Sequence, residues 1–384
     1  MTPRAPRIAA LIALLALIVA ACAAEPGPAD EPAEGPSPDA TDDDAGDVTD
    51  DGDAADDTDD VEVGRLDGVT TAEDFGDFAA EGLDRWRDDV PDIEDVRVES
   101  TADDHEQPVL WLPPDGDGQP LLVVLHSWST PYQQHLGIPF AQWAQQHGWA
   151  MVHPDFRGVF ERPEATGSDL AVQDIVDAVD FAIEQGGVDE ERVFVVGFSG
   201  GGMMSLLMAG RHPDRFAGAA AWVPIYDLVD WYTYNRDEQP QEDYAEQIEA
   251  SCGGDPTSAD DARAECEHRS PSAHLDAAVD AGVPVYIGHG LGDEIVLPSH
   301  AVRAFNHLAE DGDRLDADTA RQIGAGELPE ALQGETDAEH HFGDPDPEVF
   351  FARHSANATL VLFDGEHDMA YHPGLEWMAR LAAG

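Results

Sequence analysis

The stretch Val193-Phe-Val-Val-Gly-Phe-Ser-Gly-Gly-Gly-Met-Met204 sets a single serine among glycines, between one apolar run and another. Its centre, Gly197-Phe-Ser-Gly-Gly201, fits the G-x-S-x-G pattern, with a buried strand expected over residues 192–196 and a helix over 203–209. A tight turn between them strains the serine backbone, and side chains two residues before and after it would collide, which requires Gly197 and Gly201. The helix N-terminus adds partial positive charge and free N–H groups. These features predict that Ser199 is a nucleophile.

A serine hydroxyl is nearly inert until a base takes its proton, so a histidine and an orienting acid are expected later in the chain. The strand expected over residues 283–287 runs into a glycine-rich turn that ends at Asp293, and the strand expected over 359–363 is followed by His367. Functional groups gather at the carboxyl ends of parallel strands. We therefore predict a catalytic triad of Ser199, Asp293 and His367.

Three other residues remain alternatives as partners of the serine. Glu294 directly follows the predicted acid, and Asp227 follows an earlier expected strand. His372 lies close to the predicted histidine but adjoins a proline at the expected start of a helix, so we rank it lower.

An oxyanion formed at the serine needs two N–H donors, and the loss of one donor costs about 2.7–4 kcal/mol. We expect the first from Gly200, the residue after the nucleophile. The second is expected from the loop after the strand over residues 121–125, where Ser127 and Trp128 are equal candidates. Since only the backbone is needed, the Trp128 ring is free to line the pocket.

The strand and helix pattern predicts an α/β fold, with a mostly parallel central sheet and helices on both faces. One helix is expected over residues 72–89 and another over 169–185. Two polar segments, about 226–275 and 311–354, interrupt the alternation, and we interpret them as insertions that act as lids or binding loops. The expected strands lie around 96 and 109, and over 121–125, 149–153, 192–196, 217–223, 283–287 and 359–363.

The N-terminal segment is typical of an exported protein. Two arginines precede an apolar run over residues 8–21, and Val19-Ala-Ala-Cys22 then resembles the bacterial lipoprotein lipobox. We predict a signal peptide over 1–22 with lipidation at Cys22; the alternative is an ordinary signal peptide cut near Ala23 or Ala24. Residues 23–62 are acidic, rich in proline and alanine, and predicted to form a disordered linker. The globular part is expected over 63–384, in an extracytoplasmic, membrane-tethered location.

The chain of 384 residues carries 80 acidic and 19 basic residues, a formal net charge of −61, and every basic residue is an arginine. This balance argues against nucleic-acid binding, which needs a basic surface. From residue 63 onward the net charge is still −46. So large a charge repels itself unless salt screens it, which favours a salt-adapted (halophilic) protein; an acidic secreted protein is the alternative.

Two cysteines remain after Cys22 is set aside. Cys252 and Cys266 form an even pair inside the first insertion, which in an exported protein predicts a disulfide. Residues 339–341 with Asp344 include potential metal ligands, but no H-E-x-x-H motif or cysteine pairing accompanies them. We expect neither a metal nor another cofactor.

Taken together, these motifs resemble the α/β-hydrolase fold and, within it, the catalytic domain of the prolyl oligopeptidase family. His289-Gly-Leu-Gly-Asp-Glu-Ile-Val296 is similar to the H-G-x-x-D-x-x-V segment around that family's catalytic acid. His153-Pro-Asp-Phe-Arg-Gly158 is similar to its D-x-R-G turn, in which Asp155 and Arg157 are expected to be structural. The resemblance covers about residues 120–384.

The resemblance has three departures, of which one is the long stretch between Asp293 and His367 that the insertion over 311–354 creates. Ser127 stands where related esterases have a glycine, and too few residues precede the first core strand for the β-propeller of the prolyl oligopeptidases. The run after Ser199 also resembles secreted feruloyl and polyhydroxyalkanoate-type esterases. The resemblance implies a serine hydrolase that acts through an acyl-enzyme on a small ester or short peptide. The alternative is a non-catalytic binding lipoprotein that retains the fold.

Overall fold

In the part of the chain that the structure describes, nine strands form one sheet with the order β1-β2-β4-β3-β5-β6-β7-β9-β8. The six strands from β4 to β9 in this order run parallel, whereas β1, β2 and β8 pair antiparallel at the two edges. The bounds are β1 Glu94–Glu99, β2 Glu106–Leu112, β3 Gln119–Leu125, β4 Ala150–Pro154, β5 Val188–Phe198, β6 Gly218–Trp222, β7 Val285–Gly290, β8 Val349–Ser355 and β9 Ala358–Phe363.

The computed structural model describes residues 66, 68–239, 243–336, 342–343 and 345–384, which belong to one compact unit, Asp60–Gly384. The predicted signal peptide with Cys22, the predicted linker over 23–62, and the residues at 339–341 and 344 lie outside the described residues. No described helix is long and apolar enough to cross a membrane.

Helices cover both faces of the sheet, because successive strand residues alternate between two apolar clusters. Leu121, Val123 and Leu125 pack with α4, α5, α9 and α10, whereas Leu122 and Val124 pack with α2, α3 and α12. The predicted α/β-hydrolase architecture is therefore confirmed. The helices are α1 Ala72–Phe75, α2 Leu83–Asp89, α3 Ile138–His147, α4 Asp169–Gln185, α5 Gly200–Arg211, α6 Leu228–Glu238, α7 Tyr244–Cys252, α8 Asp260–His268, α9 Leu275–Ala281, α10 Ser299–Leu308, α11 Ala317–Gly324 and α12 Tyr371–Ala383.

Two expectations about these elements were wrong. The single helix expected over 72–89 is two short helices, because the chain turns at Gly76 and Gly82, whose φ angles of 138° and 122° favour glycine. The second insertion is not a loop throughout: it contains α11, and its last part forms the edge strand β8. The helix predicted over 169–185 has the expected bounds, with the Ser168 side chain accepting from Ala171 N–H at its start.

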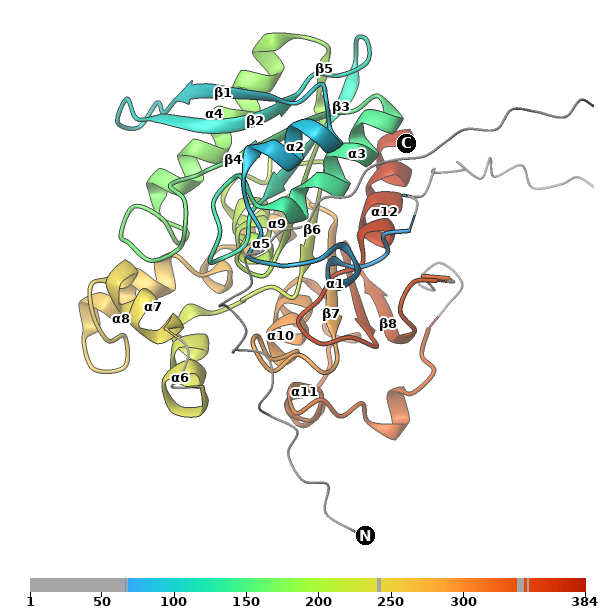
Figure 1. Cartoon of the computed structure of the whole chain (residues 1–384). Helices are drawn as coiled ribbons and strands as arrows, with labels where there is room; N and C mark the ends of the chain where they lie inside the picture. Colours follow the sequence, from blue (N-terminus) through green and yellow to red (C-terminus); the bar gives the residue numbers. More distant parts are fainter. Residues whose placement is uncertain (1–65, 67, 240–242, 337–341, 344) are drawn as a thin grey trace, which may run out of the picture. The chain divides into compact units, whose positions relative to one another are not determined.

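The first insertion folds into α6, α7 and α8, which lie together in Figure 1. The predicted Cys252–Cys266 disulfide is present and joins α7 to α8, with the two Cα atoms 5.4 Å apart. The aromatic side chain of Trp231 on α6 packs edge-on against Trp128 of the main domain, with ring centroids 4.8 Å apart. The insertion is thus a packed helical subdomain beside the loop after β3.

The turn after β4 supports that same loop. Arg157 is buried and bonds both carboxylate oxygens of the fully buried Asp174 at 2.7 and 2.9 Å, and it also bonds Asp103. Asp155 accepts a hydrogen bond from Tyr132 N–H at 3.3 Å through a carboxylate oxygen. Both residues thus have the kind of structural contacts that the D-x-R-G resemblance implies.

Candidate active site

Ser199 lies in the sharp turn between β5 and α5. Its backbone has φ 57° and ψ −115°, a region that residues with a side chain rarely adopt. A Cβ atom on Gly197 would lie 2.3 Å from the carbonyl carbon of Gly201, and one on Gly201 would lie 2.2 Å from the carbonyl oxygen of Leu125. Both distances are far below van der Waals contact, so the turn excludes side chains at these two positions.

Asp293 and His367 follow two neighbouring parallel strands, β7 and β9, whose last residues pair as Gly290 with Phe363. The imidazole Nδ1 of His367 lies 2.8 Å from Oδ2 of Asp293. The Phe198 ring packs against the His367 ring, with centroids 4.9 Å apart, so the histidine lies next to the turn that carries Ser199. The structure therefore brings the three predicted triad residues to one edge of the sheet.

The carboxylate of Asp293 is enclosed by four donors. Its Oδ1 accepts hydrogen bonds from the backbone N–H groups of Ile295 and Val296, at 2.8 and 3.0 Å. Its Oδ2 lies between His367 Nδ1 and His289 Nε2, the second at 3.2 Å. Since the residue is only 2% exposed, these contacts fix the orientation of the carboxylate toward His367.

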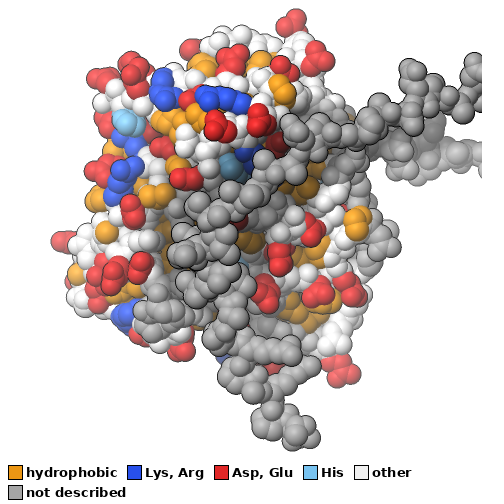
Figure 2. Space-filling model, viewed as in Figure 1, with side chains coloured by type: hydrophobic (Ala, Val, Ile, Leu, Met, Phe, Trp, Pro, Cys, Tyr) orange, Lys and Arg blue, Asp and Glu red, His pale blue; other side chains and the backbone are white. Residues whose placement is uncertain are grey.

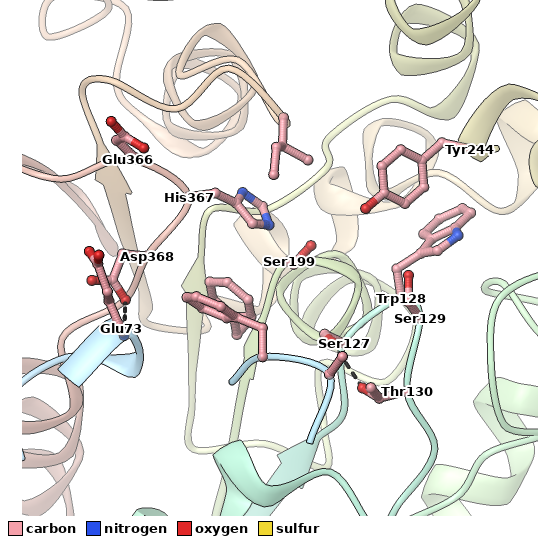
Figure 3. A pocket seen from close by; sticks show the side chains of 14 residues that line it. Glu73, Ser127, Trp128, Ser129, Thr130, Ser199, Tyr244, Glu366, His367 and Asp368 are labelled. Carbon is pink, nitrogen blue, oxygen red and sulfur yellow. Dashed lines mark hydrogen bonds between the residues drawn. The ribbon is translucent and has the colours of Figure 1, made fainter. Parts of the chain in front are cut away.

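A cavity of about 450 Å³ is lined by Ser199 and His367 together (Figure 3). Aromatic side chains, Trp128 and Tyr244, lie on one side of it, and the carboxylates of Glu73 and Asp368 lie on the other. Its volume is in the range of small-molecule sites. The remaining lining residues are Phe78, Ala79, Ser127, Ser129, Thr130, Phe198, Ile295 and Glu366.

The loop after β3 lies directly against the start of α5. A Cβ atom on Gly200 would lie only 2.7 Å from the backbone nitrogen of Trp128, so the two backbones touch there. Among the described residues, no hydrogen bond uses the N–H of Gly200 or of Trp128, whereas the N–H of Ser127 is donated to the side-chain oxygen of Gln134 at 2.9 Å. Of the two loop candidates, Trp128 therefore keeps a free donor beside Ser199.

Residues 140–324 match the model of the Prolyl oligopeptidase family (Peptidase_S9), a range that includes Ser199 and Asp293 and ends before His367. These residues are similar to the prolyl oligopeptidase family over somewhat less than half of the chain. The resemblance carried by the sequence motifs is thus confirmed for this segment.

Curated relatives of this segment include acetylxylan esterases and acylamino-acid-releasing enzymes. An acetylxylan esterase from Coprinopsis cinerea is 34% identical over 114 residues, which are 27% of this chain and 30% of that protein. Acylamino-acid-releasing enzyme 1 from Oryza sativa subsp. japonica is 29% identical over 126 residues, 30% of this chain and 16% of the rice protein. The chain thus spans less than half the length of these relatives.

Two solved structures are similar to part of this chain. The acylaminoacyl peptidase of Pyrococcus horikoshii is 20% identical with a TM-score of 0.47, and the similarity covers 56% of this chain and 34% of that one. Prolyl oligopeptidase B from Galerina marginata is 18% identical with a TM-score of 0.47, covering 62% of this chain and 36% of its own.

The alternative triad residues have other places in this domain. The Asp227 carboxylate caps α6 by accepting from the N–H groups of Val229 and Asp230. Glu294 contributes its backbone oxygen, which accepts from the Tyr234 hydroxyl at 2.6 Å. His372 is buried in the first turn of α12. Among the described residues no group of His, Cys, Asp and Glu could hold a metal ion.

The walls of the cavity differ from the sequence prediction. Of the two insertions, only the first supplies a described lining residue, Tyr244 of α7. A third wall comes from the segment before α2, through Glu73, Phe78 and Ala79. No local pattern marks these three residues as part of the site, because they reach it by pairing with chain segments far away in the sequence.

Charge around Asp293 lowers the pKa of its carboxyl. Burial by itself acts to raise the pKa, but the charge of His367 and the hydrogen bonds from His289 and His367 outweigh burial, so the pKa lies well below its ordinary value. The ionised carboxylate therefore stabilises the folded state at any pH above the ordinary aspartate pKa of about 3.9. This stabilisation is lost as the pH falls below that value toward the lower pKa of the folded state.

Asp293→Asn should lower the free energy of unfolding at pH 7 by about 1.5–3 kcal/mol, because charged hydrogen bonds are lost. The difference from the wild type should shrink as the pH falls below about 4. Urea unfolding of both proteins from pH 7 to below pH 4 measures this difference in the free energy of unfolding. Asp88→Asn, at an exposed aspartate, is the matched control and should show a small difference at every pH. A wild-type advantage that persists undiminished in acid contradicts the charge assignment.

Proposed function

We propose that this chain is a serine hydrolase that acts through an acyl-enzyme on Ser199. The observation that carries the proposal is the cavity that Ser199 and His367 line together, with Asp293 bonded to the far side of the imidazole. A nucleophile, a base and an orienting acid in this order are what acyl transfer requires. The match of residues 140–324 to the prolyl oligopeptidase family supports the same conclusion.

In the proposed reaction, His367 takes the proton of the Ser199 hydroxyl through Nε2 while the oxygen attacks the substrate carbonyl carbon. Asp293 keeps the other proton of the imidazole on Nδ1 and stabilises the imidazolium that forms. The N–H groups of Gly200 and Trp128 stabilise the oxyanion. The leaving group then departs with the proton from His367, and water, activated by the same histidine, hydrolyses the acyl-enzyme.

We propose small esters or short peptides as substrates. The size of the cavity and its aromatic and acidic walls suit a compact acyl group rather than a folded protein. The curated relatives include an acetylxylan esterase and an acylamino-acid-releasing enzyme. Comparison of kcat/KM for p-nitrophenyl acyl esters and for short peptide p-nitroanilides, including proline peptides, decides between the two.

Ser199→Ala and His367→Ala should each lower kcat for a p-nitrophenyl ester by about 10⁴-fold or more, because the triad acts as a unit. Asp293→Asn should lower it by about 10⁴-fold. Steady-state kinetics measure these losses. A fluorophosphonate probe should label the wild type and not Ser199→Ala.

The matched control is Ser251→Ala, which removes another buried hydroxyl, on α7, away from the cavity lining. It should keep both labelling and activity. If the folded wild type is not labelled at Ser199, the chain is a binding protein that retains the fold, and the enzyme proposal fails.

We also propose that the chain is exported and held at the membrane by lipid on Cys22, because Val19-Ala-Ala-Cys22 has the lipobox pattern after an apolar run. Expression of the full chain in a bacterium should place it in the membrane fraction, and Cys22→Ser should move it out of that fraction. The same distribution for both proteins contradicts lipid anchoring.

Salt adaptation is proposed from the net charge of −61 and the absence of lysine. Acidic side chains are spread over the face seen in Figure 2 and exceed the arginines there. Because the Debye length falls from about 10 Å at 0.1 M salt to about 3 Å at 1 M, salt should relieve their repulsion. The melting temperature and kcat should both rise from 0.1 M to molar KCl. No gain in either quantity contradicts salt adaptation.

A further inference from the structure

The loop that carries Ser127 and Trp128 is held by one buried side-chain amide, that of Gln134. Gln134 is 2% exposed and lies just before the short 3-10 helix His135–Gly137. Its Oε1 accepts from Ser127 N–H at 2.9 Å, and its Nε2 donates to the Ser127 hydroxyl at 2.7 Å. Nε2 also donates to the carbonyl oxygen of Phe78 at 3.0 Å. All three hydrogen bonds of the Gln134 amide are therefore made to other groups of the protein.

The partners fix which way the amide points. The backbone N–H of Ser127 needs the amide oxygen as its acceptor, and the backbone carbonyl of Phe78 needs the amide nitrogen as its donor. The reverse orientation would place N–H against NH₂ and oxygen against oxygen. The Ser127 hydroxyl is in turn hydrogen-bonded to Thr130 Oγ1 at 3.1 Å, the contact drawn in Figure 3. Gln134 thus sets both the backbone and the side chain of Ser127.

This bonding has a consequence for the next residue in the loop. Since Ser127 N–H is occupied by Gln134, the donor left beside Ser199 is the N–H of Trp128. The loop lies against Gly200 so closely that a Cβ there would be 2.7 Å from Trp128 N and 2.9 Å from Trp128 Cα. A small shift of the loop would therefore change the distance between the Trp128 N–H and the oxyanion of the proposed reaction.

Gln134 also joins this loop to a segment that we call the N-terminal strap, residues 70–82. On one side, the strap accepts hydrogen bonds from the loop region at two carbonyl oxygens: Phe78 O from the Gln134 amide and Ala80 O from His135 N–H. It also donates one, from Gly82 N–H to Gln133 O. On the other side it bonds the segment after His367, with Ala72 N donating to Met369 O at 3.0 Å and Glu73 N donating to Asp368 Oδ1 at 3.1 Å.

We propose that Gln134 is a positioning residue that holds the Trp128 N–H in place as the second oxyanion donor, with the N-terminal strap as its support. The inference rests on the proposed function, because it assigns the geometry of that reaction's oxyanion site. Gln134 does not touch the reacting atoms; it acts through Ser127 and the strap. Related esterases have a glycine at the position of Ser127. The Ser127 hydroxyl gives the Gln134 amide a second hydrogen bond to the loop, besides the one to the Ser127 N–H.

Gln134→Glu tests the proposal with a side chain of the same shape. The carboxylate still accepts from Ser127 N–H but cannot donate to Phe78 O. We expect kcat for p-nitrophenyl acetate to fall about 10- to 100-fold, somewhat less than the 10²–10³-fold loss of a whole donor, with KM little changed. The inhibition constant of phenylboronic acid, whose tetrahedral adduct places an oxygen at the same donors, should rise by a similar factor.

Gln133→Glu is the matched control, because in the described part of the chain its half-buried side-chain amide bonds the Tyr132 hydroxyl, at 3.2 Å, and not the loop donors. It should keep wild-type kcat and boronate inhibition. Gln134→Met, which keeps the side-chain length without polar atoms, covers the case in which the carboxylate variant does not fold. It should show the same loss in kcat and in boronate affinity.

Fluorophosphonate labelling separates the two proposals. If wild type and variants are all labelled at Ser199 and the folded Gln134 variants have wild-type kcat, the positioning role is overturned and the hydrolase remains. A fall in kcat with unchanged boronate inhibition also overturns it, since that pattern reports a general structural defect. No labelling of the folded wild type overturns the hydrolase and the positioning role together.

Discussion

The backbone of Ser199 has a positive φ at the end of a buried strand, and the rest of the candidate site depends on this strained turn. The strain persists because neighbouring backbone fills the space where side chains would be: Gly201 lies against Gly197 and against Leu125. The same close packing brings the start of α5 against the loop after β3. Where the two segments meet, the N–H groups of Gly200 and Trp128 have no hydrogen-bond acceptor among the described residues.

Sheet topology supplies the other half of the arrangement. β7 and β9 are adjacent and parallel, although α10, α11 and β8 separate them along the chain. Their carboxyl ends therefore deliver Asp293 and His367 side by side, and the buried carboxylate is held by two backbone N–H groups and two imidazoles. The N-terminal strap then connects the histidine segment to the loop after β3, so the parts of the cavity are joined by hydrogen bonds as well as by the sheet.

Much of this site could be predicted from the sequence because its signals are local. Glycine spacing around Ser199 follows from sterics within one turn, and Asp293 and His367 each follow an apolar strand directly. The cavity walls could not be predicted in the same way. Phe78 and Gln134 meet through a contact across 56 positions of the chain, and β8 is an edge strand whose pairing, not its composition, defines it. The helix break at Gly76 and Gly82 was missed because the apolar spacing on both sides of it is compatible with one helix.

The central claim is that acyl transfer passes through Ser199, and trapping the acyl-enzyme tests it most directly. The wild type is mixed with p-nitrophenyl acetate, quenched in acid within the first turnovers, and its intact mass and peptides are measured. The account predicts one acetyl group per chain, on Ser199, that is formed at the rate of p-nitrophenol release and lost on further incubation. Turnover without an adduct, or an adduct on another residue that forms at the rate of turnover, would contradict it.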